Sequence, residues 1–481
     1  MTIARHRSFR VQRILCMMMA LVLFPAFHPA IQVVRAADEG EKTVPESPQK
    51  AEAENGKDEN KQKEKKEEDR YFALLGGDVF TITGPVMEET DILVKNGIIH
   101  ALGPNLVLPD PCESLDVRGM KVYPGLIAVA SSGILGREPP ENSTDLFAMD
   151  MVLGLAGGLT TVVTGTTAAK LTYGTTENMI LKRNVFTSLN YTRNQPMQRQ
   201  EMWNDFRLVE QYLRDLDAYE TSKSMGLKDL KEPDKKQIKG KLENYLKLMT
   251  GEATALVNAA TSQQILDVCE LAQAFGFKLV INNAFESWIV SGEIGRAGAQ
   301  VILIPRQKAD PDESKSRPTG SNIETARILY DHGVNFTLLP ERTGISLGGI
   351  TGRDLLTLPM EAAFAVRGGL PAKAAIEAIT INAARMLGLD KRIGSIEKGK
   401  DADLIVCDGD LLHYNTLVQW TVVNGRVAYD KEKETLFSHI RPREPSKANV
   451  IDFWPRPFGE MPDYDQGTDS TDPAPESDIS H

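Results

Sequence analysis

Between residues 124 and 390 the sequence alternates short apolar runs with helical stretches. The runs at 160–164 and 301–304 are continuous and rich in β-branched residues, which is typical of buried parallel strands. The stretches at 262–275 and 371–387 have apolar residues at helical spacing. Strand-then-helix units repeated over about 270 residues predict a TIM-type (β/α)8 barrel, because that fold usually takes about 250 residues.

The segments on either side of this region have a β-rich pattern. Residues 71–123 and 391–437 contain short alternating runs, and each contains an Asn-Gly pair (96–97 and 424–425) that is typical of a tight hairpin turn. The simplest arrangement pairs both ends of the chain into one small composite β-sandwich. The expected fold class is therefore α/β, a barrel at 124–390 plus this sandwich. A charged helical insertion at 199–250 has no assigned role.

The two termini have compositions that do not favour a packed core. Four arginines and no acidic residue precede an apolar run at 14–27, and 34–36 fits a small-residue cleavage site. This pattern predicts a signal peptide over 1–36, with an uncleaved anchor as the alternative. Residues 37–70 are charged and lack aromatic residues, which predicts a disordered linker, and 438–481 reads as an extended acidic tail.

Export would place the mature chain in the periplasm, the cell envelope or the extracellular space. We expect no membrane span after cleavage, because the only long apolar run is removed with the signal. The formal net charge of −11 argues against nucleic acid as a partner. Cys112, Cys269 and Cys407 remain after cleavage, an odd and scattered set that gives no disulfide framework and favours buried free thiols.

Several motifs identify a family resemblance that covers roughly residues 71–437. The most specific is 382–389 (Asn-Ala-Ala-Arg-Met-Leu-Gly-Leu), continued by 394–406 (Gly-Ser-Ile-Glu-Lys-Gly-Lys-Asp-Ala-Asp-Leu-Ile-Val). Residues 122–127 and 157–162 match the entry to the first barrel strand and the second strand. The chain resembles the amidohydrolase superfamily, especially its imidazolonepropionase-like branch. The resemblance implies the barrel-plus-sandwich fold and a lineage of hydrolases that act on carbon–nitrogen bonds other than peptide bonds.

The same resemblance implies a zinc or other divalent metal site, but its ligand positions are changed. Family members follow Pro-Gly-Leu-Ile with Asp-x-His-x-His, and here Ala130 and Ser132 occupy the two histidine positions. Histidines would also be expected where Asn258, Ala260 and Asn283 stand. A bridging carboxylate or carboxylated lysine would fall near 178–183.

One carboxylate remains at an expected position. By the resemblance, Glu341 stands where the final strand supplies a catalytic Asp, and Arg342 follows it. A catalytic metal lowers the pKa of bound water from about 15.7 to about 7. A lone general base contributes only about 10²–10⁴-fold, so Glu341 could not replace the ion by itself. We therefore expect no bound cofactor.

The few histidines do not rebuild a site. Five follow the signal segment, and of these His332 alone falls within 124–390, in an Asp-His-Gly sequence typical of a helix end. Ser131 or Ser132 with Glu341 is an alternative nucleophile scheme, but it has no histidine base. The pocket of Ala130, Ser132, Asn258, Ala260, Asn283 and Arg342 could bind a small polar ligand, or its residues could only satisfy one another.

Two functions follow from these residues. The first is an exported amidohydrolase-like protein that has lost its metal and acts as a non-catalytic binding or interaction module. The alternative is an active carbon–nitrogen hydrolase with an atypical site centred on Glu341. A homodimer, or pairing with an active paralogue, is the expected assembly.

Overall fold

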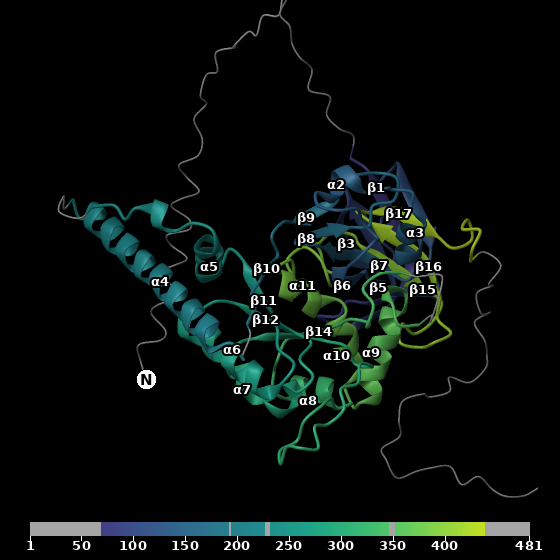
Figure 1. The fold of residues 1–481 in the computed structure, drawn as a ribbon. Coiled ribbons are helices and arrows are strands. Elements are labelled where there is room, and N and C mark those ends of the chain that lie inside the picture. The colour runs from purple at the N-terminus through teal and green to yellow at the C-terminus, as the bar shows by residue number, and fades with distance from the viewer. Residues whose placement is uncertain (1–68, 192–193, 227–230, 346–351, 438–481) are drawn as a thin grey trace, which may run out of the picture. The chain divides into compact units, whose positions relative to one another are not determined.

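Both ends of the chain contribute strands to one sheet in the computed structural model, which describes residues 69–191, 194–226, 231–345 and 352–437 (Figure 1). The sheet has eight strands in the order β17-β16-β15-β5-β1-β2-β3, with β4 beside β1. These strands are β1 (Tyr71–Phe80), β2 (Val86–Lys95), β3 (Ile98–Gly103), β4 (Cys112–Asp116), β5 (Lys121–Pro124), β15 (Leu404–Cys407), β16 (Val418–Val423) and β17 (Arg426–Asp430). The antiparallel pairing of β5 with β15 joins the two ends.

Both predicted hairpins are present, at Asn96-Gly97 and Asn424-Gly425. All four of these residues have positive φ, between 51° and 82°, as a type I′ turn requires. The antiparallel pairs β2–β3 and β16–β17 flank the two turns. The pairing defines a single sheet, so the face-to-face layers of a sandwich stay a prediction.

The middle of the chain forms two further sheets. One has four strands, β6 (Leu126–Ser131), β7 (Leu159–Thr164), β8 (Thr167–Lys170) and β9 (Ile180–Lys182). The other has five parallel strands, β10 (Phe186–Ser188), β11 (Thr254–Asn258), β12 (Leu279–Asn282), β13 (Gln300–Leu303) and β14 (Phe336–Leu338). Parallel strands separated by helices confirm the α/β class.

The helices follow the strands as crossover segments and insertions. They are α2 (Pro140–Ser143), α3 (Met149–Ala156), α4 (Pro196–Ser224), α5 (Lys241–Met249), α6 (Ser262–Phe275), α7 (Ser291–Ala297), α8 (Thr325–Asp331), α9 (Leu358–Arg367), α10 (Ala372–Ala378) and α11 (Ile381–Leu387), with short 3₁₀ turns η2 (Lys235–Gln237), η3 (Ser287–Ile289) and η4 (Leu355–Thr357). None of these helices is both long and apolar enough to cross a membrane.

The expected closed (β/α)8 ring is not formed by the described strands. After β7 the chain turns back, so that β8 and β9 pair antiparallel at one edge. The edge strands β14 and β6 belong to different sheets and do not pair with each other. The segment between α10 and α11 lies between them and bonds to both. Ile127 N donates to Ile379 O at 3.0 Å, and Thr337 Oγ1 donates to Ala378 O at 2.8 Å. These bonds satisfy polar groups that a closing strand would otherwise pair.

The predicted helix at 371–387 is two helices, because the chain bends at Thr380. Thr380 has φ −132° and ψ −97°, and its hydroxyl donates to Ile376 O at 2.6 Å. A threonine hydroxyl that bonds a preceding carbonyl competes with helix continuation. The sequence pattern could not show this break, because apolar residues keep helical spacing across it.

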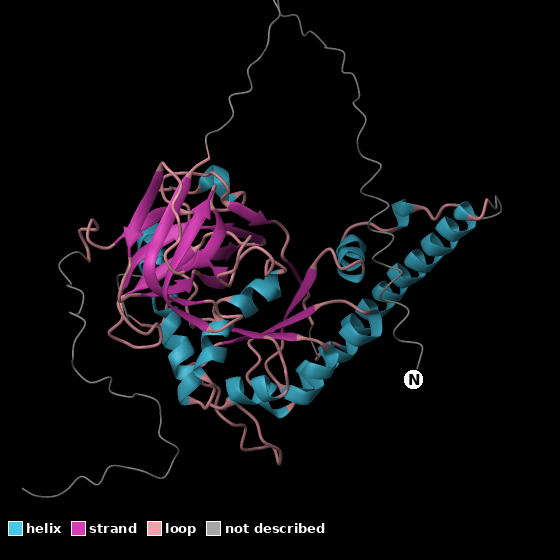
Figure 2. Cartoon of the chain, turned by 180° about the vertical axis from the view of Figure 1, so that it is seen from behind, coloured by secondary structure: helices cyan, strands magenta, loops and turns pink. Residues whose placement is uncertain are grey.

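The predicted insertion is helical as expected. Its main element, α4, has 29 residues, and Figure 2 shows it as one uninterrupted rod. Phe206 on α4 stacks against Tyr245 of α5 at 4.4 Å and against Phe275 of α6 at 5.0 Å, measured between ring centroids. These aromatic contacts anchor the insertion to the helix that follows β11.

Candidate functional site

The candidate positions lie after the C-terminal ends of several strands, where α/β folds place their ligands. At the end of β6, Ser131 Oγ donates to Val163 O at 3.0 Å and lies 2.9 Å from Thr164 Oγ1. Ser132 N donates to Thr343 O at 2.8 Å. Ala130 is half-buried and offers only a methyl group. Neither serine hydroxyl contacts a histidine or carboxylate in the described chain, so the nucleophile scheme gains no support.

Asparagine amides gather at the ends of β11 and β12. Asn258 Oδ1 accepts from Asn282 Nδ2 at 3.0 Å and from Asn283 Nδ2 at 3.3 Å. Asn283 has φ +56°, a left-handed conformation that asparagine tolerates better than most residues. The structure therefore brings Asn258, Asn282 and Asn283 together at the strand ends.

Ala260 has a structural role through its backbone. Its N–H donates to Gln264 Oε1 at 3.1 Å, beside the Thr261 capping box that begins α6. Its carbonyl accepts from Glu286 N at 3.1 Å. A position that the resemblance assigns to a metal ligand thus serves as the entry to a helix.

Glu341 is bonded to a neighbouring loop. Arg353 Nη1 donates to Glu341 Oε2 at 2.8 Å, and both side chains are about half exposed. Arg342 is exposed, and its N–H donates to Arg353 O at 3.0 Å. The arginine compensates the Glu341 charge, an arrangement that favours a structural ion pair over a general base, and nothing in the geometry favours the hydrolase alternative.

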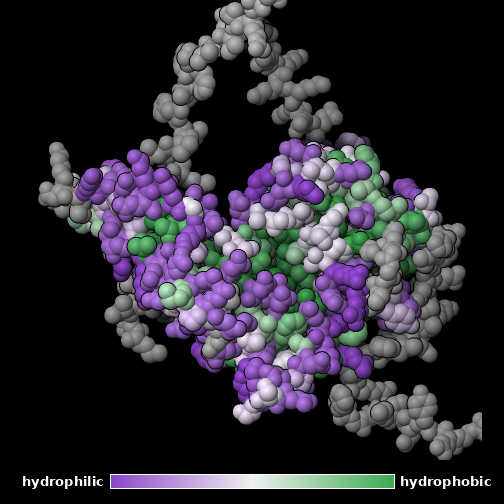
Figure 3. Space-filling model, in the orientation of Figure 1, coloured by the Kyte–Doolittle hydropathy of each residue, from purple (hydrophilic) through white to green (hydrophobic). Residues whose placement is uncertain are grey.

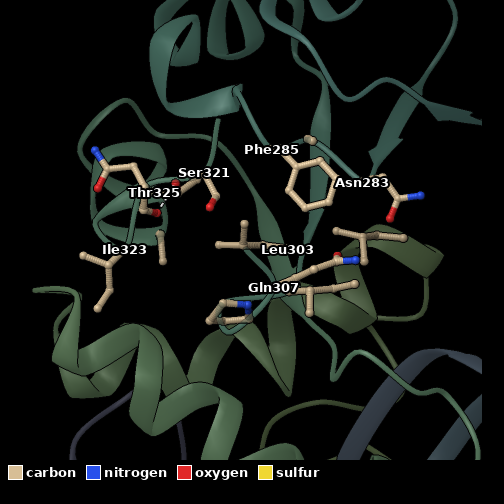
Figure 4. Close-up of a pocket in the computed structure, with 13 residues that line it drawn as sticks. Asn283, Phe285, Leu303, Gln307, Ser321, Ile323 and Thr325 are labelled. Atoms are coloured by element: carbon tan, nitrogen blue, oxygen red, sulfur yellow. Dashed lines mark hydrogen bonds between the residues drawn. The ribbon is translucent and has the colours of Figure 1, made fainter. Parts of the chain in front are cut away.

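A small pocket open to solvent, with a volume of about 20 Å³, lies beyond the ends of β12 and β13 (Figure 4). Its polar groups come from Asn283, Gln307, Ser321, Asn322 and Thr325, and Thr325 Oγ1 donates to Asn322 O at 2.6 Å. The apolar part of the lining is Ala284, Phe285, Ile302, Leu303, Ile304, Pro305, Ile323 and Ala326. Among the described residues that line it, none is ionisable.

The charged groups beside this pocket are paired within the protein. Arg306 Nε donates to Glu361 Oε1 at 2.7 Å, and the guanidinium lies 5.1 Å from the Phe364 ring centroid. Burial raises the pKa of Glu361, while Arg306 opposes this shift. The neighbouring Gln307, which is uncharged, lines the pocket.

A buried carboxylate holds the loop that covers the pocket. Glu286 is 5% exposed and accepts from Ser262 N at 2.7 Å, Ser262 Oγ at 2.9 Å and Arg317 Nη1 at 3.0 Å. Trp288 Nε1 donates to Gly320 O at 2.9 Å. Burial works against ionisation of Glu286, but the hydrogen bonds and Arg317 prevail and lower its pKa below the usual range.

Two other candidate residues lie away from the amide cluster. Lys182, the lysine within 178–183, donates from Nζ to Leu387 O at the end of α11, at 2.8 Å. Burial and Lys278 lower its pKa. His332 caps α8, as its sequence context predicts, with Nδ1 2.8 Å from Ile328 O and 3.1 Å from Ser291 Oγ.

Comparison with known proteins places this geometry in a family. The amidohydrolase family profile matches residues 250–436. A dihydroorotase of Aquifex aeolicus is 23% identical over 368 residues, which is 66% of this chain and 85% of that protein. The solved structure of an amidohydrolase from Thermotoga maritima covers 75% of this chain and all of its own, with a TM-score of 0.58 and 24% identity. These matches support the amidohydrolase superfamily for this chain.

Some of the similar proteins match this chain over only a short part of their length. An imidazolonepropionase of Picrophilus torridus is 46% identical, but over only 57 residues, 11% of this chain and 14% of that protein. The chain thus spans about a seventh of the length of that relative. The Thermotoga structure supports an amidohydrolase-type fold, although the described strands here do not close the ring.

The side chains at the positions that the family resemblance assigns to metal ligands do not fit a zinc ion. Zinc in proteins binds histidine nitrogen, thiolate sulfur or carboxylate oxygen. The five positions hold two methyl groups, one hydroxyl and two amides, and the two amides hydrogen-bond each other. Within the described ranges, no group of three or more His, Cys, Asp or Glu side chains could hold a metal.

The pocket contains residues that the sequence did not reveal. Gln307 and Phe285 follow predicted strands by a few residues, so the rule that ligands bind beyond strand ends could have found them. Ser321 comes from a long loop without a recognisable motif, and its position is set by hydrogen bonds with Ala309, whose N–H donates to Ser321 Oγ at 3.0 Å and whose carbonyl accepts from Ser321 N at 3.0 Å.

Proposed function

We propose that this amidohydrolase-superfamily protein binds a small uncharged polar molecule at the ends of β12 and β13 and performs no metal-dependent hydrolysis. The observation that carries the proposal is the pocket lining, which offers hydrogen-bonding groups without an ionisable side chain. The amides of Asn258 and Asn283 stand where the family resemblance leads one to expect histidines.

The chemistry of the lining selects the ligand class. Amides and hydroxyls both donate and accept hydrogen bonds, so they can match carboxamide or hydroxyl groups of a ligand. A charged ligand would lose its hydration without gaining a counter-ion, which disfavours it strongly. Phe285 adds an apolar surface against which a planar or ring-shaped ligand can pack (Figure 4).

The proposal also includes the setting in which the protein works. An arginine-rich, apolar N-terminal segment supports export to the periplasm or cell exterior, although residues 1–36 lie outside the described chain. A binding module without its own chemistry would act through a partner, either a second copy or an active paralogue. The acidic net charge of −11 supports the absence of nucleic acid among its partners.

Elemental analysis of the purified chain tests the metal-free part. We expect far less than one zinc or manganese ion per chain after dialysis against metal-containing buffer, and no change in melting temperature on adding a chelator. One or more tightly bound ions per chain would overturn it.

A thermal-shift screen tests the binding part. Uncharged amides and polyols form the probe set, with acetate and methylammonium as charged comparisons. We expect stabilisation by at least one uncharged probe, reduced in Gln307→Ala, and none by the ions. Gln211→Ala is the matched control, because Gln211 lies on α4 and bonds Asp215 there. Absence of any shift with the uncharged set would refute a binding role.

A further inference from the structure

The helical insertion builds a second pocket, distinct from the one at β12 and β13. It is open to solvent and has a volume of about 140 Å³. It lies between α4, α5 and the segment that follows β10, and Figure 3 shows a largely hydrophilic surface over these two helices. Leu189 N donates to Leu256 O at 3.0 Å, which holds the segment after β10 against β11. This pocket therefore adjoins the strand ends without sharing a lining residue with the first.

Charges of both signs line this second pocket. Lys241 Nζ lies 2.9 Å from Asp205 Oδ2 and also contacts Glu201. Arg199 adds a second cation, 3.8 Å from Asp267. Two acids and two cations thus face one cavity, in contrast to the uncharged lining at β12 and β13.

The floor of the pocket is rigid, while its charged groups are accessible. Asp205 is 9% exposed and Tyr245 is 8% exposed, and Tyr245 is held by the stacked ring of Phe206. By contrast, the side chains of Glu201 and Lys241 are more than half exposed. A ligand could therefore reach the charges from solvent while the buried floor stays in place.

The class of ligand that fits the second pocket is decided by the need to keep every charged group paired when the ligand binds. A simple cation would displace Lys241 and leave it unpaired, and a simple anion would leave the carboxylates unpaired; either outcome is costly at a half-buried site. A zwitterion avoids both costs, because its carboxylate can take the place of Glu201 beside Lys241 and its ammonium can pair with Asp205. Every charge then keeps an opposite partner.

We propose that the α4–α5 insertion forms a binding site for a zwitterionic small molecule, such as an amino acid or short peptide with free termini. Lys241 and Arg199 receive its carboxylate, and Asp205 and Glu201 receive its ammonium group. The site is independent of the uncharged pocket at β12 and β13, and it gives the insertion a role that the sequence does not reveal.

Calorimetric titration of the full chain with L-alanine and L-alanyl-L-alanine tests the proposal. We expect saturable binding of at least one, weakened at least about tenfold by N-acetylation and likewise by C-amidation, because each removes a charge-assisted pairing. No saturable binding of either zwitterion, or equal binding of the blocked compounds, would overturn the proposal.

Variants of exposed residues locate the binding. Glu201→Gln and Lys241→Met should each weaken it at least about tenfold without changing the circular dichroism spectrum. Lys247→Met is the matched control on the same helix, since Lys247 lies 3.9 Å from Glu243 and does not line the pocket. Gln307→Ala should leave zwitterion binding unchanged. The binding proposals for the two pockets can therefore be refuted independently of each other. Equal affinity in the Lys241 and Lys247 variants would contradict the assignment.

Discussion

At the scale of single residues, the most consequential side chain is the buried Lys170. It is fully buried at the end of β8, and its ammonium lies 2.8 Å from both Asp401 Oδ2 and Asp403 Oδ2. It also donates to Asn424 Oδ1 at 2.6 Å. The lysine thereby ties the four-stranded sheet to the eight-stranded sheet, through the Asp-Ala-Asp motif that also carries the family resemblance.

We expect Lys170→Met to lower the free energy of unfolding by about 3–5 kcal/mol, because it leaves the buried Asp403 carboxylate without its cation, whereas Asp401 keeps its pairing with Arg392. Urea unfolding followed by circular dichroism measures the loss. Adding Asp403→Asn to Lys170→Met should recover part of it. The surface pair Lys433–Asp430 is the control, since the Lys433 side chain is 83% exposed and Lys433→Met should change nothing measurable. Equal effects of the two lysine changes would contradict the argument.

At the scale of elements, the loop between β13 and α8 depends on Glu286. Removing the charge with Glu286→Gln weakens the bonds from Ser262 and Arg317 that hold this loop over the pocket. We expect faster tryptic cleavage at Lys308 and Lys315, with little change in overall secondary structure, because local opening precedes cleavage. Glu293→Gln serves as the comparison, since Glu293 forms only a surface pair with Arg296. Identical cleavage rates in the two variants would refute the role of Glu286.

The same carboxylate predicts a pH dependence for the loop. The pKa of Glu286 is lowered in the folded protein, so its stabilising contribution is complete above the ordinary glutamate pKa of about 4.3 and is lost as the pH falls through the lowered value. Hydrogen exchange of the 305–321 amides, corrected for intrinsic rates, should stay protected at neutral pH and lose protection only in acid. Loss of protection already between pH 7 and 5 would contradict this sign.

At the scale of the whole molecule, the buried thiols report on cooperativity. Cys269 lies in α6 and Cys407 in β15; both are buried and unpaired, and burial raises the pKa of Cys269 to about 12 and that of Cys407 further. Of the three cysteines in the described residues, we expect only the partly exposed Cys112 to react with a thiol reagent in the native protein. Because Cys269 and Cys407 belong to one continuous hydrophobic core, they should become reactive together in rising urea. Clearly separate transitions would show that the two regions unfold independently.

Much of the fold follows from local pattern, and the exceptions have physical causes. The predicted helix at 262–275 coincides with α6, whose Thr261 capping box and Gly276 fix both ends locally. The helix break at Thr380 depends on the rotamer of one hydroxyl group. The open edge at Ile379 depends on a hydrogen bond to Ile127, which is distant in the sequence. Periodicity carries no information about either, so the sequence predicted a continuous helix and a closed ring.

The candidate site, like the fold, could be predicted from the sequence only in part. The sequence identified Asn258 and Asn283 because strand ends are recognisable from apolar runs. It could not show that Arg353 pairs with Glu341, because no pattern in the sequence relates these two residues. Nor could it show the charged pocket of the insertion, which exists only because α4 and α5 fold against each other.

The amide cluster at the ends of β11 and β12 has a consequence for the conditions under which the protein works. Imidazole groups change charge between about pH 5 and 8, so a histidine-lined site gains or loses function across that interval. Carboxamides such as Asn258, Asn282 and Asn283 do not titrate there. Capture of an uncharged molecule at Asn283, the member of this cluster that lines the pocket, would therefore proceed equally well in mildly acidic and mildly alkaline surroundings.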